Sequence, residues 1–83
     1  MKIKYFAWLR ERLNRGEEEV SPPPEVVTVA DLIAWLRSRD EAADLAMHKP
    51  SLIKAAVDTQ IVPHTALIAN AKVIALFPPM TGG

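Results

Sequence analysis

The sequence contains no cysteine, which excludes disulfide bonds, thiolate nucleophiles and cysteine-based metal sites. It also has no excess charge, because ten Lys and Arg balance ten Asp and Glu, so no overall field attracts nucleic acid or an anionic membrane. No apolar run approaches the roughly 20 residues of a membrane-spanning helix. Near the amino terminus Lys4 interrupts the apolar run from Ile3 to Leu9, so we expect no secretory signal and a cytoplasmic protein.

The length of 83 residues allows one domain and leaves no room for a second substrate-binding module. A chain of this size buries only ~60% of its unfolded surface, so a deep enclosed active site is difficult to build. With 49% hydrophobic and 24% charged residues, the composition is that of an ordinary soluble domain. We therefore expect the function to depend on a surface, a tail or a partner.

The first twenty residues predict two strands and a helical turn. Alternating apolar side chains in 2–9 predict a strand with one buried face, and 9–13 can form a helical turn. A turn at 14–16 follows, in which Gly16 tolerates a positive φ. A short return strand is expected at 17–20, before three consecutive prolines.

The strongest local signal is a helix from Thr28 to Arg39. Thr28 can cap it, and Asp31 stands at the third helical position of a capping box. The apolar residues have helical spacing: Val29, Leu32, Ile33 and Leu36. A shorter helix is expected at 41–49, since acidic residues open this segment and Lys49 and Pro50 end it.

The rest of the chain predicts three strands with turns between them. The expected elements are strands at 53–57 and 60–62 joined by Asp58-Thr59, a helical turn at 66–69, a turn at Asn70-Ala71 and a last strand at 72–77. This order predicts an α+β domain with a mixed sheet of about five strands and one long helix packed across one face. It fits a β-grasp, the ubiquitin-like fold, although sequence order alone leaves a ferredoxin-like sandwich open.

Few side chains are candidates for chemistry. His48 and His64 have no partner at a metal-ligand spacing, so we expect no metal site. The serines lack the context of an exposed nucleophile, and no glycine-rich phosphate loop is present. The charges of 17–19 and of Arg37 with Arg39 are interpreted as solvated faces, and Trp35 as a packing residue.

The carboxyl-terminal segment is the exception. Residues 78–83 follow the last predicted strand as a tail in which Pro78 and Pro79 fix φ and so lower the entropy lost on insertion into a partner. Gly82 and Gly83 have no Cβ and can pass through a narrow channel. A terminal glycine carboxylate, with a pKa of ~3.5, is ionised and can attack the α-phosphate of ATP in another protein's site. The segment therefore suits a swinging acyl group, and the alternative is a frayed end.

Three segments carry a resemblance to a known family: 4–11, the stretch from Ser51 to Val62, and the ending Phe77-Pro78-Pro79-Met80-Thr81-Gly82-Gly83. Together they resemble the small, sulfur-carrier subunit of molybdopterin synthase. Related thiamine-pathway carriers share only the final Gly-Gly of that ending. One departure is Asn70-Ala71, where the family often has Asp-Gly, and alanine disfavours the positive φ such a turn requires.

The resemblance implies a β-grasp domain at 1–77 and a flexible tail at 78–83. It implies an adenylating enzyme that uses ATP and Mg²⁺ to activate the carboxylate of Gly83, and a sulfur donor system that converts it to a thiocarboxylate. The tail, made of Pro78, Pro79, Met80, Thr81, Gly82 and Gly83, would then enter the large subunit of molybdopterin synthase. Two carriers and two large subunits form a heterotetramer in that family, the catalytic site lies in the large subunit, and the carrier holds no permanent cofactor.

The single long helix can cover only one face of the sheet. We expect Ile74 and Leu76 to face it together with Ile3 and Tyr5. The residues left on the other face would form a partner-binding patch with Met80 nearby: Phe6, Val73, Ala75 and Phe77. The alternative is that these residues only cap the sheet.

Three other functions remain open from the sequence. The chain could carry sulfur for thiamine synthesis or tRNA thiolation, it could be a ubiquitin-like modifier that forms an amide with target lysines, or it could be an interaction domain with an idle tail.

Overall fold

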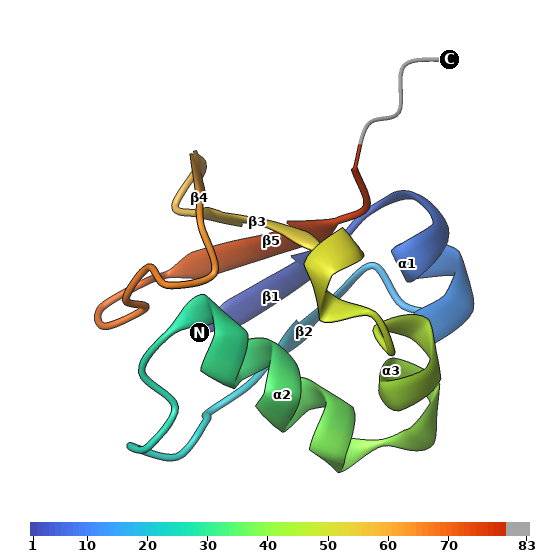
Figure 1. Cartoon of the computed structure of the whole chain (residues 1–83), viewed down its shortest axis with the longest axis horizontal. Helices are drawn as coiled ribbons and strands as arrows, with labels where there is room; N and C mark the ends of the chain where they lie inside the picture. Colours follow the sequence, from blue (N-terminus) through green and yellow to red (C-terminus); the bar gives the residue numbers. More distant parts are fainter. Residues whose placement is uncertain (80–83) are drawn as a thin grey trace.

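The computed structural model describes residues 1–79, and Met80 to Gly83 lie outside the described part (Figure 1). The elements follow one another in this order: β1 (Lys2–Tyr5), α1 (Ala7–Leu13), β2 (Glu17–Glu19), α2 (Val29–Arg39), α3 (Glu41–Ala46), the 3₁₀ turn η1 (Pro50–Leu52), β3 (Lys54–Val57), β4 (Gln60–Val62) and β5 (Val73–Phe77).

The strands form one mixed sheet in the order β2-β1-β5-β3-β4. The first and last strands, β1 and β5, lie side by side and parallel, whereas the other pairs are antiparallel. The helices lie to one side of this sheet (Figure 1). This is the β-grasp fold, as predicted. The ferredoxin-like alternative is excluded because its elements run β-α-β-β-α-β.

Strand alternation places the core between the sheet and the helices. Ile3 pairs with Ile74 and Tyr5 with Leu76 across β1 and β5, and all four side chains are at most 1% exposed. The apolar positions of α2 that were predicted to face the sheet, Val29, Leu32, Ile33 and Leu36, are equally buried. The predicted inward face of the two central strands is therefore confirmed.

The start of α2 is stabilised both by its own cap and by a distant loop. The Thr28 Oγ1 accepts from the Asp31 N–H and the Asp31 carboxylate accepts from the Thr28 N–H, which is the predicted capping box. The N–H groups of Val29 and Ala30 donate to the carbonyl oxygens of Ala66 and His64. The predicted helical turn at 66–69 is wrong. This segment instead forms an antiparallel bridge, Leu67 with Thr28, beside the start of α2. There the carbonyls of His64 and Ala66 accept from N–H groups that have no partner within the helix.

The predicted strand at 2–9 is also too long. It ends at Tyr5, and the chain turns at Ala7, whose φ is 55°. Leu9 and Leu13 then reach the core from α1, because a spacing of four places them on one helical face. The helical turn predicted at 9–13 is thus confirmed, although the helix begins two residues earlier, at Ala7.

The turn after α1 uses a different residue from the one expected. Asn14 takes the left-handed conformation, with φ 55°, and its N–H closes the last turn of α1 on the carbonyl of Glu11. The turn predicted at 14–16 is therefore present, but Asn14 and not Gly16 takes the positive φ. Later in the chain Asn70 takes φ 66° and Ala71 does not, so the departure from the family's Asp-Gly turn places no alanine in a strained conformation.

Other predicted ends shift by one to three residues. The return strand β2 stops at Glu19 instead of residue 20, β3 begins at Lys54 instead of residue 53, and β5 begins at Val73 instead of residue 72. The helix expected at 41–49 ends at Ala46, because the chain turns at the buried Met47 and enters η1 at Pro50.

Candidate functional site

The candidate site is the open face of the sheet, opposite the helices. The alternation that buries Ile74 and Leu76 leaves Val73, Ala75 and Phe77 half-buried on this face. Phe6 follows the end of β1 and is 45% exposed. Burial thus confirms that the four residues of the predicted patch point away from the core. That they contact a partner stays a prediction.

Strand register extends the apolar surface across the sheet to β4. Ala75 of β5 pairs with Ala56 of β3, which pairs with Ile61 of β4. Ala56 is only 8% exposed, whereas Ile61 is 76% exposed and is a large apolar side chain in the same row. The sequence analysis missed Ile61, since adjacent apolar residues at 61 and 62 do not show which one faces outward. The pairing register supplies that information.

The row of alanines forms the floor of a hollow of about 630 Å³. Its apolar lining comes from Phe6, Ala56, Val73 and Ala75, and its rim carries Lys4 and Lys72. The hollow is shallow and lies on the sheet face, so it is suited to a protruding group of another molecule rather than to an enclosed substrate.

One end of this hollow is fixed by the hairpin between β3 and β4. Asp58 and Thr59 both have positive φ, 45° and 76°, which is the conformation of a two-residue hairpin turn. The Asp58 Oδ1 accepts from the N–H groups of Lys72 and Val73, at 3.0 and 2.9 Å. The Asp58 carboxylate therefore holds the start of β5 against the hairpin.

The other end of the open face is where β5 leaves the sheet. The Phe6 N–H donates to the Leu76 carbonyl at 3.1 Å, and Phe77 lies opposite Lys54 of β3. Pro78 is buried and Pro79 half-buried. The predicted tail residues Met80, Thr81, Gly82 and Gly83 lie outside the described residues, so the reactive Gly83 stays a prediction.

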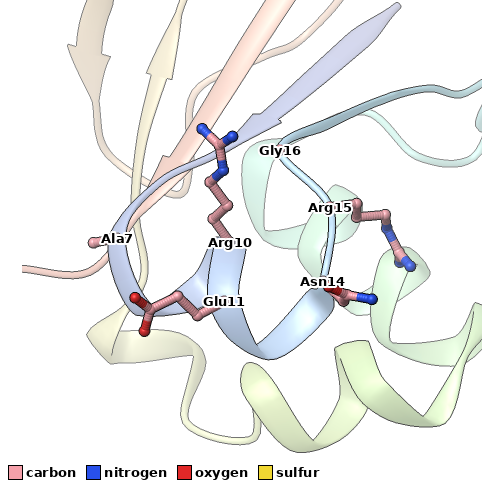
Figure 2. A pocket seen from close by; sticks show the side chains of 6 residues that line it. All are labelled: Ala7, Arg10, Glu11, Asn14, Arg15 and Gly16. Atoms are coloured by element: carbon pink, nitrogen blue, oxygen red, sulfur yellow. The ribbon is translucent and has the colours of Figure 1, made fainter.

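A second hollow, of about 480 Å³, lies beside α1 and holds chemically capable side chains (Figure 2). These side chains diverge. The Arg10 guanidinium lies against Gly16, where a Cβ would come within 3.1 Å of it, and Arg15 points away toward Asp40. Glu11 extends in another direction. No acid and base converge on a common point in this hollow.

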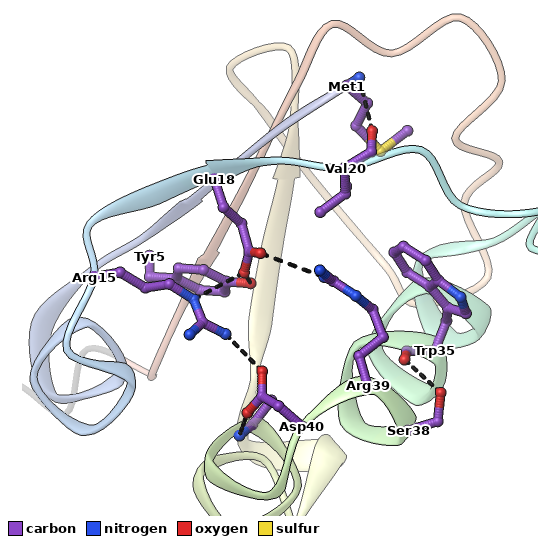
Figure 3. Close-up of polar contacts among 10 residues, drawn as sticks. Met1, Tyr5, Arg15, Glu18, Val20, Trp35, Ser38, Arg39 and Asp40 are labelled. Carbon is purple, nitrogen blue, oxygen red and sulfur yellow. Dashed lines mark hydrogen bonds and ion pairs between the residues drawn. The ribbon is translucent and has the colours of Figure 1, made fainter.

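A cluster of titratable groups joins β1, β2 and the helices (Figure 3). The Glu18 carboxylate accepts from the Tyr5 hydroxyl at 2.7 Å, from Arg15 Nε at 3.0 Å and from Arg39 at 3.4 Å. Arg15 also donates to Asp40 at 2.8 Å. The interpretation of the 17–19 run and of Arg39 as purely solvated is therefore wrong for Glu18 and Arg39, which take part in a tertiary network.

This network perturbs the pKa values of four ionisable groups, among them Arg15, where burial acts to lower the pKa but Asp40 and Glu18 raise it. Burial and the hydrogen bond to Glu18 raise the pKa of the Tyr5 hydroxyl. Burial acts to raise the pKa of Glu18, but the hydrogen bond from Tyr5 and the charges of the two arginines outweigh it and leave that pKa below its ordinary value. The pKa of Asp40 is lowered by the Ala43 N–H and by Arg15. Since the members of this network satisfy one another, we assign it to stability rather than to catalysis.

Comparison with known proteins places the chain in a family. The family model described as the ThiS family matches residues 3–83. The chain belongs to the ThiS family. No curated protein matches this ThiS-family chain by sequence.

Solved structures with the same fold include SAMP1 from Haloferax volcanii, with a TM-score of 0.73, 24% identity and coverage of 100% of this chain and 98% of that one. A Pyrococcus furiosus protein named as a molybdopterin converting factor, subunit 1, has a TM-score of 0.72 and 28% identity over 94% of both chains. The ThiS-family chain thus has the β-grasp fold of a small sulfur carrier.

The remaining candidates of this ThiS-family chain have structural partners. His48 contacts the Leu45 carbonyl through Nδ1 at 3.0 Å, and His64 contacts the Ile53 carbonyl through Nε2 at 2.6 Å. Trp35 packs against the core and carries Arg39 over its ring. Within residues 1–79, no three His, Asp or Glu side chains gather as a metal site would require. Over the same range, no helix is long and apolar enough to cross a membrane.

Proposed function

We propose that this ThiS-family chain is the sulfur-carrier subunit of molybdopterin synthase. The observation that carries the proposal is the course of β5, which crosses the open apolar face and ends at Phe77, immediately before the sequence Pro-Pro-Met-Thr-Gly-Gly. A docked partner could thus receive the tail beside the surface that binds it. The 28% identity with a protein named as a molybdopterin converting factor subunit supports the choice of pathway.

The proposed cycle begins in an adenylating enzyme that uses ATP and Mg²⁺. A carboxylate oxygen of Gly83 bonds to the α-phosphorus of ATP, and pyrophosphate leaves. Sulfur from a donor system then bonds to the carbonyl carbon, AMP leaves, and the terminus becomes a thiocarboxylate. Adenylation is needed because a carboxylate oxygen is otherwise a poor leaving group.

In the second half of the cycle, the charged carrier docks on the large subunit of molybdopterin synthase. Pro78, Pro79, Met80 and Thr81 form the stalk, and Gly82 lets the terminus pass because it has no Cβ. In the catalytic site of the large subunit, the thiocarboxylate sulfur of Gly83 bonds to a carbon of the cyclic pyranopterin monophosphate. Water then cleaves the acyl C–S bond of the resulting thioester, which leaves the sulfur on the pterin and returns Gly83 to the carboxylate. The patch of Phe6, Val73, Ala75 and Phe77 contacts the partner, and two copies of each subunit form a heterotetramer.

The test is to mix the thiocarboxylated carrier with the large subunit and the cyclic pyranopterin monophosphate. We expect a stable complex and formation of the dithiolene product, with return of Gly83 to the carboxylate. If the large subunit does not bind and sulfur is delivered to a thiazole-forming or tRNA-thiolating acceptor, the carrier belongs to one of those pathways. A Gly-Gly remnant on cellular lysines, without sulfur transfer, would identify a protein modifier.

A further inference from the structure

The hollow on the open face has a shape and a charge that restrict what can occupy it. We propose that it receives an apolar side chain from an acidic surface of the protein partner. This inference rests on the proposed function, because it describes how the large subunit of molybdopterin synthase is recognised.

The shape follows from two alanines. Ala56 and Ala75 face each other in register across β3 and β5, and their short side chains leave a depression of about 630 Å³. Larger apolar residues, Phe6 and Val73, contribute to its lining. A protruding apolar side chain would bury its own apolar surface and that of the floor, which the hydrophobic effect favours. Such a contact fits the anchor residue of an interface.

The positive charge of the open face follows from which charged side chains form ion pairs and which do not. On the helix side, Arg15 and Arg39 pair with Glu18, and Arg37 pairs with Asp44. On the open face Lys4 and Lys72 line the hollow and Lys54 lies opposite Phe77, and none of these three forms an ion pair within residues 1–79. Lys2, opposite Val73, is paired with Glu17. The chain has no net charge, yet these three cations around an apolar floor make this face locally positive.

The carboxylates near this face do not cancel the three lysines. Asp58 lies at the rim, but its Oδ1 is occupied by two backbone N–H groups of 72–73. Glu17 is the register partner of Lys4 on β2, but its carboxylate forms its ion pair with Lys2, and Glu19 pairs with the amino group of Met1. Carboxylates supplied by a partner would therefore find free cations here.

The same pattern argues against a second copy of this chain as the occupant. In a symmetric dimer formed face to face, both contacting surfaces would carry the same unpaired lysines and the same excess of positive charge. Like charges brought together in an interface are costly. An acidic partner meets no such repulsion.

The first test fills the hollow. Ala75→Leu places a larger side chain over the floor, and Ala34→Leu makes the same change at an exposed position of α2 on the helix side. Binding to the large subunit is measured by titration calorimetry, with thermal unfolding as a check on the fold. We expect Ala75→Leu to weaken binding by about tenfold or more, as for loss of an anchor contact, and Ala34→Leu to have no effect.

The second test reverses a charge without touching the floor. Lys72→Glu changes the side chain but keeps the backbone N–H that donates a hydrogen bond to Asp58. Lys49→Glu is the matched control, at an exposed lysine between α3 and η1. We expect Lys72→Glu to slow association with the large subunit, with a loss that shrinks at high salt, whereas Lys49→Glu changes little.

The outcomes separate this inference from the proposed function. If the wild-type carrier binds the large subunit and both open-face variants bind equally well, the inference is wrong and the proposed function stands. Self-association of the wild-type carrier that Ala75→Leu abolishes would also overturn it, because a second copy would then be the occupant. If the wild-type carrier forms no complex at all, the proposed function itself fails.

Discussion

At the scale of single residues, Glu18 connects more elements than any local pattern indicates. Its carboxylate binds Tyr5 from β1, Arg15 from the turn before β2, and Arg39 from the end of α2. These hydrogen bonds favour the ionised carboxylate. Ionised Glu18 therefore contributes to folding stability, which makes stability depend on pH.

The first prediction concerns that dependence. The pKa values of Glu18 and Asp40 are lowered in the folded protein, so their contribution is present above the unfolded values of about 4.3 and 3.9 and is lost as pH falls through the folded values. Urea unfolding should show a free energy of unfolding that declines as pH falls below about 4.3. Glu18→Gln should remove part of that decline, and Glu25→Gln, at an exposed glutamate, should not. An unchanged pH dependence in Glu18→Gln would contradict this role.

The second prediction concerns Thr59, which combines a branched side chain with a φ of 76°. A left-handed conformation costs an L-residue roughly 1–2 kcal/mol, whereas glycine adopts it freely. Thr59→Gly should therefore stabilise the domain by about 1 kcal/mol in urea unfolding. Thr65→Gly, at an exposed residue without a positive φ, should not stabilise it. A loss of stability in Thr59→Gly would show that the hairpin does not carry this strain.

At the scale of elements, β5 contributes to two surfaces at once. Leu76 is fully buried against the helices and Phe77 is half-buried on the open face. Adjacent residues should thus separate folding from binding. Leu76→Ala should lower the free energy of unfolding by about 2–5 kcal/mol, whereas Phe77→Ala should lower it less and weaken the complex with the large subunit more. Calorimetry of both variants, free and with the partner, checks this. A core-sized loss in Phe77→Ala with unchanged affinity would contradict the assigned face.

The elements that could be predicted from sequence are those with local causes. The capping box and the apolar stripe of the helix from Val29 to Arg39 are formed by neighbouring residues of the sequence. The hairpin between β3 and β4 is likewise indicated by its own turn residues, Asp58 and Thr59. The segment at 66–69 could not be predicted, because its shape depends on donors at the start of α2. Likewise four patch residues followed from alternation, but Ile61 depended on register, and the pairing of Glu18 depended on the tertiary arrangement.

At the scale of the whole molecule, the two sides of the sheet have different roles. The helix side contains the core and most of the side-chain ion pairs, so it accounts for stability. The open side combines an apolar surface with lysines that lack partners within residues 1–79, and β5 ends there. We propose that separating stability from binding in this way lets the tail and the open face change partners without a change of fold.

The central claim is that the carboxylate of Gly83 is the site of chemistry. The most direct measurement is the intact mass of the carrier after incubation with its adenylating enzyme, ATP, Mg²⁺ and a sulfur source. A carrier extended by one residue after Gly83 is the matched control, because the extension moves the carboxylate about 3.5 Å along the chain while touching no buried backbone. We predict that the wild-type carrier exchanges one oxygen for one sulfur at Gly83 and that the extended carrier, although folded, does not. An unmodified wild-type terminus, or equal sulfur incorporation in the extended carrier, would contradict the account.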